Sequence, residues 1–175
     1  MTHNRTIHRD TVRPEWVDYN GHLRDAFYML IFSLATDAFM DRIGLDDAAR
    51  TSRGRSLFTL EAHINYLHEI KEGTAVRVEA SVLAFDAKRV HLYMEMFAGE
   101  GTGPIAASEQ MLLHVDTTNG AKSATFDADI AGRIEAMFRD TPNEAPKEAR
   151  YAGRVIGLPS GPRAVASAST GVKPA

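Results

Sequence analysis

The chain contains no cysteine among its 175 residues. A disulfide framework, a thiolate metal site and a cysteine nucleophile are therefore all excluded. An excess of one charge sign is also lacking, because 20 basic residues face 23 acidic residues and the formal net charge is −3. The basic residues are scattered singly or in pairs, so neither nucleic acid nor an anionic membrane is expected as a partner.

A long hydrophobic run is missing as well. The most apolar stretch, residues 26–35, contains only Ser33 as a polar residue and is far shorter than the ~20 residues that a membrane span requires. Residues 1–10 mix His, Asn, Arg and Thr and have no apolar core of the kind that a signal peptide needs. We therefore expect a cytoplasmic protein.

The length and the hydrophobic content of 44% fit one domain with a sizeable core, which we expect over residues 1–140. Prolines recur beyond it, and the composition then turns to Ala, Ser, Thr and Gly. These changes predict an extended segment over residues 141–163 and a disordered tail over residues 164–175. Residues 153–157 have a short apolar core and are expected to dock as an extra strand or a clamp.

The apolar stretch of residues 26–35 is expected in a buried helix. Asn20 and Gly21 precede this helix, and Gly44 follows it at the place where a left-handed cap would end it. Large apolar side chains run around most of the circumference, so a curved sheet would have to surround nearly all of the helix. These side chains belong to Phe27, Tyr28, Leu30, Ile31, Phe32 and Leu34.

Apolar residues alternate with a period of two in four segments after the helix, as in strands with one buried face. Turn-forming residues at 71–73, 86–88 and 99–104 indicate hairpins between them. A strand over residues 6–13 and a second helix over residues 127–139 complete an α+β fold, in which about five antiparallel strands curve around one long helix. On each expected strand one group of residues shares a face: Phe58, Leu60, Ala62, Ile64 and Tyr66 on the first; Val76, Val78, Ala80 and Val82 on the second; Val90, Leu92, Met94 and Met96 on the third; and Met111, Leu113 and Val115 on the fourth.

The run Asp18-Tyr19-Asn20-Gly21-His22 is the richest in chemistry. It brings a carboxylate, a carboxamide and an imidazole together just before the helix, whose first backbone N–H groups can hold a developing negative charge. That combination suits acyl transfer. The alternative is an ordinary turn, since Asn-Gly is a strong turn dipeptide and Asp18 or Asn20 would then cap the helix.

The order of strand, Asp-x-Asn-Gly-His run, buried helix and further strands resembles the hotdog-fold acyl-CoA thioesterases, and is most similar to the betainyl-CoA thioesterase type of carnitine and betaine breakdown. The resemblance implies hydrolysis of a short or polar acyl-CoA, with betainyl-CoA as the leading substrate. It implies no metal and no cofactor, coenzyme A being part of the substrate. It also implies a homodimer or homotetramer with active sites between subunits. The segments that carry the resemblance are residues 14–22, 59–63 and 109–115.

Roles for the run follow from this resemblance. Asp18 is the expected nucleophile or general base, and Asn20 would orient the water or the carbonyl group. Backbone N–H groups of Gly21 and His22 would stabilise the oxyanion. The side chain of His22 would share in proton transfer to the leaving thiol.

Glu61, His63 and Asn65 alternate along one expected strand, so they share a face that lines either a cleft or solvent. Plant acyl-carrier-protein thioesterases resemble the run but carry a further acid where this chain has Asn65. Glu61 would have to serve in its place, with His63 and Asn65 binding substrate. Glu109 alternates in step with Met111, Leu113 and Val115 and so would point into the same apolar face. A buried acid there is expected to pair with His63 or a group at the helix start, unless a bulge turns it outward.

Several aromatic residues lie near the run in the sequence. Two or three of these rings could form a cage for a trimethylammonium group, with ~0.5–2 kcal/mol of cation–π attraction per ring. The alternative is that they pack the core and a dimer contact. The phosphates of coenzyme A bind basic side chains, and the candidates for this role are Lys88, Arg89, Arg55 and Arg154. The aromatic candidates are Trp16, Tyr19, Phe27, Tyr28 and Tyr66.

Two other functions remain open on the same fold. An acyl-CoA hydratase is less favoured, because the acid precedes a Gly-His turn instead of taking the hydratase arrangement. A non-catalytic acyl-CoA sensor or binding module would keep the ligand without turnover. No histidine pair has metal-ligand spacing, and no Gly-rich nucleotide motif occurs.

Overall fold

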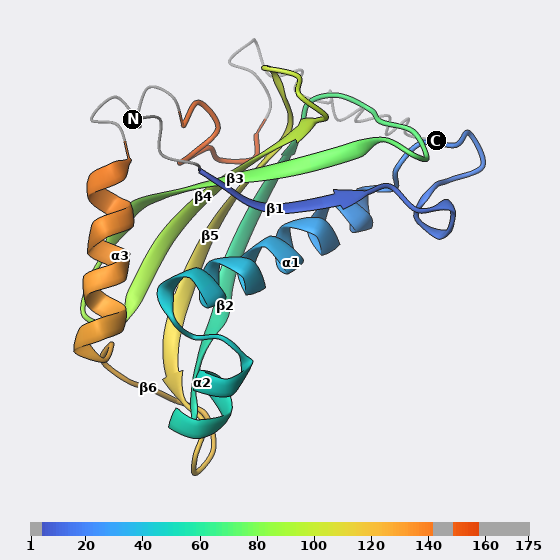
Figure 1. Ribbon diagram of the computed structural model, residues 1–175. Helices are drawn as coiled ribbons and strands as arrows, with labels where there is room; N and C mark the ends of the chain where they lie inside the picture. The colour runs from blue at the N-terminus through green and yellow to red at the C-terminus, as the bar shows by residue number, and fades with distance from the viewer. Residues whose placement is uncertain (1–4, 142–148, 158–175) are drawn as a thin grey trace, which may run out of the picture.

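The computed structural model describes residues 5–141 and 149–157. An antiparallel sheet in the order β1-β3-β4-β5-β2, with the short β6 paired to β5, curves over the long helix α1 (Figure 1). The expected α+β architecture is confirmed. The elements are β1 Thr6–Thr11, a 3-10 turn Pro14–Trp16, α1 Asp25–Ile43, α2 Asp47–Arg53, β2 Arg55–Tyr66, β3 Ala75–Phe85, β4 Arg89–Ala98, β5 Pro104–Asp116, β6 Lys122–Ser123 and α3 Ala128–Asp140.

Helix α1 begins at Asp25, later than the expected boundary, and its N-cap residue Arg24 makes no side-chain cap bond. It ends at Gly44, whose φ of 89° is left-handed and favours glycine. One face of the helix packs on the sheet, while Leu30 on the opposite face is exposed. The expectation that the sheet surrounds nearly the whole helix was therefore wrong. None of the described helices has the length and apolar character of a membrane span.

A bulge in β2 decides which of its side chains meet the helix. The register against β5 shifts at Leu60, and one extra residue reverses the two faces of a strand. Phe58 therefore lies opposite Leu113 on the outer face, whereas Ala62 lies opposite Gln110 on the face that holds α1. The expectation that Phe58 and Ala62 share a face was wrong for this reason.

The inward face of β5 carries buried polar residues. Gln110 and His114 are both buried there, and Thr36 Oγ1 of α1 lies 3.0 Å from Gln110 Oε1. Met111 and Leu113, which were expected to face the core, are only half-buried on the outer face. Both faces of β5 are largely covered, so alternation alone could not tell which one meets the helix.

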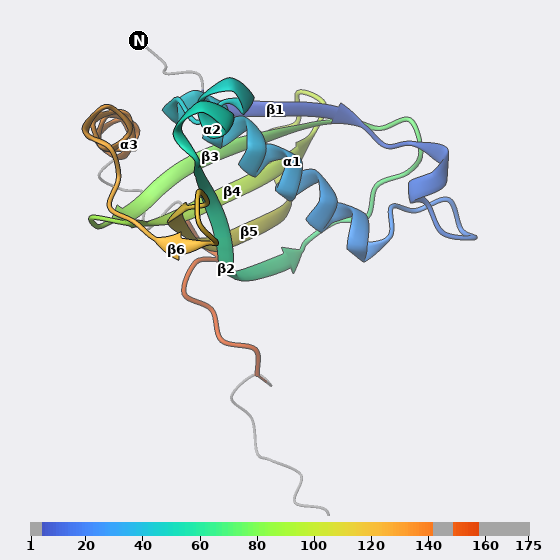
Figure 2. The ribbon, with the colours of Figure 1, turned by 90° about the horizontal axis from the view of Figure 1, so that it is seen from below.

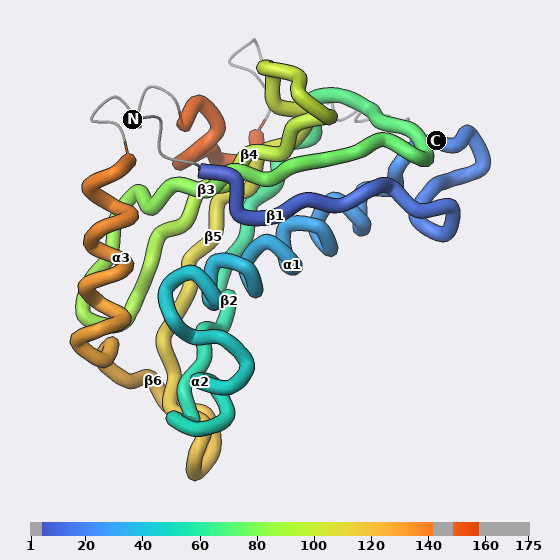
Figure 3. The backbone as a smooth tube through the Cα atoms, viewed as in Figure 1, coloured from blue at the N-terminus to red at the C-terminus, as the bar shows by residue number. Residues whose placement is uncertain are grey.

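Two of the three expected hairpins are confirmed, because β3 pairs with β4 and β4 pairs with β5. The hairpin at residues 71–73 was wrong, since β2 lies at one edge of the sheet and β3 pairs with β1 near the other. The chain instead crosses the end of the sheet and passes the loop after β1 (Figure 3), where Gly73 N–H donates to Val12 O at 2.9 Å. The expected inward residues of β3 and β4 are all buried: Val76, Val78, Ala80, Val82, Val90, Leu92, Met94 and Met96.

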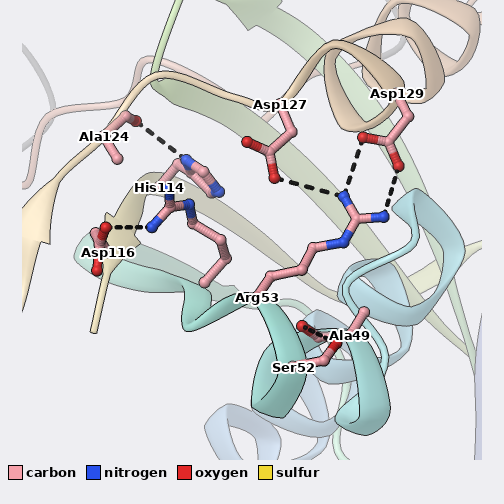
Figure 4. Close-up of polar contacts among 9 residues, drawn as sticks. Ala49, Ser52, Arg53, His114, Asp116, Ala124, Asp127 and Asp129 are labelled. Carbon is pink, nitrogen blue, oxygen red and sulfur yellow. Dashed lines mark hydrogen bonds and ion pairs between the residues drawn. The ribbon is translucent and has the colours of Figure 1, made fainter. Parts of the chain in front are cut away.

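Helix α2 was not expected, whereas α3 confirms the predicted second helix. Asp46 caps α2 at its start by accepting a backbone N–H of the first turn, and Gly54 ends it with a φ of 62°. Arg53 at the end of α2 reaches across to the start of α3 (Figure 4). Its guanidinium lies 3.4 Å from Asp127 Oδ2 and 2.9 Å from Asp129 Oδ2. This pair of contacts fastens α2 to α3.

Residues 149–157 lie across the sheet from α1, on its outer face (Figures 1 and 2). Ala149 is buried there against Tyr93 of β4. Residues 153–157 were expected to dock as an extra strand or a clamp. No strand forms there and Val155 is 91% exposed, but Gly153 N–H donates to Glu109 Oε2 of β5 at 2.7 Å, so this end of the segment is fastened to the sheet. The predicted tail over residues 164–175 lies outside the described residues.

Candidate active site

The run from Asp18 to His22 folds as a closed turn, which we call the Asp18 turn. Asp18 N–H donates to His22 O at 2.9 Å. In return, Asp18 Oδ1 accepts the N–H groups of Asn20 at 2.8 Å and His22 at 3.1 Å. Gly21 takes a φ of 76° and donates its N–H to Asp18 O at 3.0 Å. The run therefore forms a turn, which is compatible with a catalytic role, and neither side chain caps α1, which begins only at Asp25.

These bonds correct one expectation and support another. The backbone N–H groups of Gly21 and His22 were expected to be free for an oxyanion, but both already donate to Asp18. The N–H groups of His22 and Asn20, which both donate to Asp18 Oδ1, hold the pKa of Asp18 below its usual value of 3.8, with the His22 N–H as the largest cause. Asp18 is therefore an ionised carboxylate at neutral pH.

The Asp18 turn is fastened to the connection between β2 and β3. Leu23 N–H donates to Ile70 O at 2.8 Å, and His22 forms a bridge with Lys71. The imidazole Nε2 of His22 lies 3.8 Å from Glu69 Oε2. A connection that looked like a hairpin in the sequence thus forms the second wall of the candidate site.

A cavity of about 350 Å³ opens between this connection and the start of α1. Buried Tyr28 donates its hydroxyl to His68 O at 3.1 Å, and the Tyr66 ring meets the Tyr28 ring edge to face at 5.4 Å. Burial raises the pKa of both phenols, so both stay neutral hydrogen-bond donors at pH 7. The lining residues are Leu23, Asp25, Tyr28, Tyr66, Leu67, His68 and Glu69.

Three polar lining residues, Asp25, His68 and Glu69, were missed from the sequence. Asp25 had one local signal, because an acid in the first turn is typical of a helix start. Glu69 and His68 follow β2 and meet the helix only because the chain crosses the sheet end at this point. No short-range pattern in the sequence reports such a crossing.

Only two of the aromatic candidates meet at the cavity. Trp16 is 4% exposed and stacks on Phe27 with ring centroids 5.7 Å apart, as the core alternative predicted. Tyr19 is 94% exposed and points away from the packed structure. Within one chain, the expected cage is therefore reduced to Tyr28 and Tyr66.

Glu61, His63 and Asn65 share a face, as expected, but it is the outer face of the sheet. Glu61 and His63 line a second cavity of about 260 Å³, which has no lining residue in common with the first. Arg154 lines it too, and its Nη1 lies 3.4 Å from Asn65 Oδ1. A single chain thus separates Glu61 from Asp18.

Glu109 is paired on this outer face, although not with the expected partners. Its Oε1 lies 2.6 Å from His91 Nε2, and its Oε2 accepts the Gly153 N–H at 2.7 Å. The expectation of His63 or a group at the helix start was wrong: His63 of β2 lies directly opposite Glu109, but the carboxylate bonds to His91, which lies diagonally across on β4. No three His, Asp or Glu side chains form a metal site in the described ranges.

The basic candidates for coenzyme A lie away from the first cavity. Lys88 and Arg89 belong to the β3–β4 turn, at the end of β3 remote from the Asp18 turn. Arg89 binds Asp86 at 2.6 Å and is the main reason that the pKa of Asp86 falls to about 2. Arg55 pairs with Asp116 at the start of β2. One chain therefore brings none of the four basic candidates to the first cavity.

Comparison with known sequences places these features in a family. Residues 12–134 match the family described as the thioesterase-like superfamily. A Pseudomonas aeruginosa protein named betainyl-CoA thioesterase is 48% identical over 91% of this chain and 98% of its own length. An Agrobacterium fabrum protein named L-carnitine dehydrogenase/betainyl-CoA thioesterase is 41% identical over 63% of this chain and 22% of its own length.

Two solved structures are also similar to this chain in fold and sequence. A structure from Pseudomonas putida KT2440 is 49% identical, with a TM-score of 0.75 over 89% of this chain and 97% of that one. The Staphylococcus aureus protein SAV2348, solved in complex with CoA, is 29% identical, with a TM-score of 0.77 over 88% of this chain and 96% of that one. The half-barrel sheet with its central helix is therefore common to all three.

Proposed function

Since this chain belongs to the thioesterase-like superfamily and is an acyl-CoA thioesterase, we propose that its substrate is betainyl-CoA and that Asp18 carries the reaction. The 48% identity over nearly the whole length of a betainyl-CoA thioesterase is the observation that supports this substrate. The same similarity favours hydrolysis over the hydratase and sensor alternatives.

Asp18 provides the charge that the reaction needs. In hydrolysis a water oxygen bonds to the thioester carbonyl carbon, the C–S bond breaks, and the thiolate leaves with a proton. Asp18 either attacks the carbon itself, giving an anhydride that water cleaves, or removes a proton from the attacking water. Both routes need the ionised carboxylate, which the lowered pKa of Asp18 supports.

Asn20 and His22 assist from the same turn. The carboxamide of Asn20 makes no hydrogen bond within the described ranges, so it can donate to the carbonyl oxygen as negative charge develops. It takes the part first expected of the Gly21 and His22 backbone N–H groups, which are occupied. The His22 imidazole, held beside Glu69, delivers a proton to the leaving sulfur.

We also propose a cytoplasmic homodimer, or a tetramer of such dimers, joined along β2. In the described part of the chain β2 pairs only with β5, which leaves its other edge open, and Leu60 on it is 57% exposed. Free strand edges of this length are usually covered by a partner. Glu61, Lys88 and Arg89, which one chain keeps away from Asp18, would act there from the second subunit.

The test is thiol release from betainyl-, acetyl-, hydroxybenzoyl- and long-chain acyl-CoA, followed with a colorimetric thiol reagent. We expect betainyl-CoA to be preferred and Asp18→Asn to lower kcat about 100-fold or more, the scale of a lost general base. The variant should still bind the ester, because an amide oxygen can accept both turn N–H groups. Asp37→Asn, on the exposed face of α1, is the matched control. Full activity of Asp18→Asn would contradict the proposal.

A further inference from the structure

We propose that Asp25 and Glu69, together with the Tyr66 ring, form the site that selects a trimethylammonium acyl group. This inference rests on the proposed function and assigns the residues that would set its specificity. Among the described residues, the cavity beside the Asp18 turn is lined by two carboxylates and by neither lysine nor arginine. A quaternary ammonium group keeps its positive charge at every pH, so a wall of this sign attracts it.

The placement of the two carboxylates carries the argument beyond charge alone. Asp25 stands at the start of α1 and Glu69 in the first half of the crossing connection between β2 and β3, so they line the cavity from separate segments. The Tyr66 ring belongs to the same wall, and its hydroxyl lies 3.4 Å from Asp25 O. Aromatic rings bind quaternary ammonium groups by cation–π attraction, and two carboxylates in the same lining add charge attraction.

The cavity also adjoins the reacting groups. Leu23 lines it and forms a backbone bridge with Val17, which closes the Asp18 turn from the other side. Glu69 links the cavity to the Asp18 turn, because it lines the cavity and its Oε2 lies 3.8 Å from His22 Nε2. An acyl group whose cationic end enters the cavity therefore has its carbonyl end directed toward the Asp18 turn.

The same wall disfavours other acyl groups. An acyl chain that ends in a carboxylate is repelled by Asp25 and Glu69, and an uncharged branched chain gains no charge attraction. A tertiary-butyl group has nearly the shape of a trimethylammonium group without its charge. The pair betainyl-CoA and 3,3-dimethylbutyryl-CoA thus isolates the contribution of the charge.

The experiment measures kcat/KM for these two esters in the wild type, Asp25→Asn, Glu69→Gln and the control Asp37→Asn. We expect the wild type to prefer betainyl-CoA, and each cavity variant to reduce that preference about 5-fold, the scale of one partly exposed charge pair. The ratio of the two kcat/KM values is the readout, because a loss that Glu69→Gln causes through His22 lowers both esters alike, whereas the lost charge lowers betainyl-CoA alone. Asp37→Asn should keep the wild-type preference.

Two results would overturn the inference, and they are distinguishable. A wild type that prefers betainyl-CoA, with a preference that survives in both Asp25→Asn and Glu69→Gln, overturns the assignment of these residues and leaves the proposed substrate intact. A wild type that hydrolyses the neutral ester at least as well as betainyl-CoA overturns the proposed substrate and this inference together.

Discussion

At Asp18 the two carboxylate oxygens have different surroundings. Oδ1 accepts the N–H groups of Asn20 and His22 and so holds the turn, whereas Oδ2 makes no hydrogen bond in the described ranges. A carboxylate oxygen without a partner remains available to a substrate or a water molecule. The structural and the chemical roles of this residue can therefore be separated by a change that keeps Oδ1 and removes the charge.

The pKa of Asp18 sets a testable pH dependence. A depressed pKa means that the carboxylate stays ionised until the pH falls through a value below 3.8. We therefore expect the ratio of wild-type to Asp18→Asn activity to stay flat between about pH 5 and 8, because the titration of other groups changes both activities alike. Initial rates over this range measure the ratio. A ratio that rises with pH inside the range would show that Asp18 titrates there.

The residues of the candidate site could be predicted from the sequence only where the signal is local. Asp18, Tyr28 and Tyr66 stand in or beside recognisable patterns, and all three reach the site region. Glu69 was missed because a chain crossing brings it there. Glu61 was expected beside Asp18, but the pleat of β2 directs it to the outer face, and only a second subunit could bring the two together.

Among the elements, those with a buried apolar stripe were predictable and those without one were not. Helix α3 buries Ile130 and Ile134, whereas the short helix α2 buries no residue and so gives no periodic signal. Its capping residues, Asp46 and Gly54, were the only marks in the sequence. The bulge at Leu60 left no mark at all, because it changes the register without changing the alternation of residue types.

The Arg53 contacts predict how firmly α2 is held. Arg53→Met removes ion pairs to Asp127 and Asp129 that are partly exposed and therefore weak and sensitive to salt. We expect the melting temperature to fall by about 2–4 °C at low salt, with a smaller drop in about 1 M salt. Thermal unfolding followed by circular dichroism measures both.

Arg139→Met is the control, because it removes an ion pair to Glu135 that lies within α3 alone. This variant should change the melting temperature by less than the Arg53 variant does. An equal effect of the two substitutions, or a loss at Arg53 that salt leaves unchanged, would show that the contact between α2 and α3 is not electrostatic.

At the scale of the whole molecule, one chain leaves two features without a partner. Among residues 5–141 and 149–157, no strand pairs with the outer edge of the 12-residue β2, and Leu30 is an exposed apolar residue on α1. Glu61 of β2 and the two basic residues of the β3–β4 turn, Lys88 and Arg89, were expected at the active site but lie away from Asp18 in the same chain. A second copy paired along β2 would cover the edge, and it is the simplest arrangement that could bring those candidates to the site.

Leu60→Lys tests that arrangement, because a lysine on a strand edge opposes edge-to-edge pairing. We expect the wild type to show at least twice the chain mass of 19.2 kDa by light scattering, and the variant to shift toward a single chain. Because Leu60 is 57% exposed in one chain, the variant should still fold. Val155→Lys introduces a lysine at an exposed position across the sheet from α1 and should keep the wild-type mass.

The activity of the Leu60 variant then shows where the site lies. A folded single-chain variant with full thioesterase activity would mean that each subunit holds a complete site, whereas a joint loss of mass and kcat/KM would place part of the site on the partner.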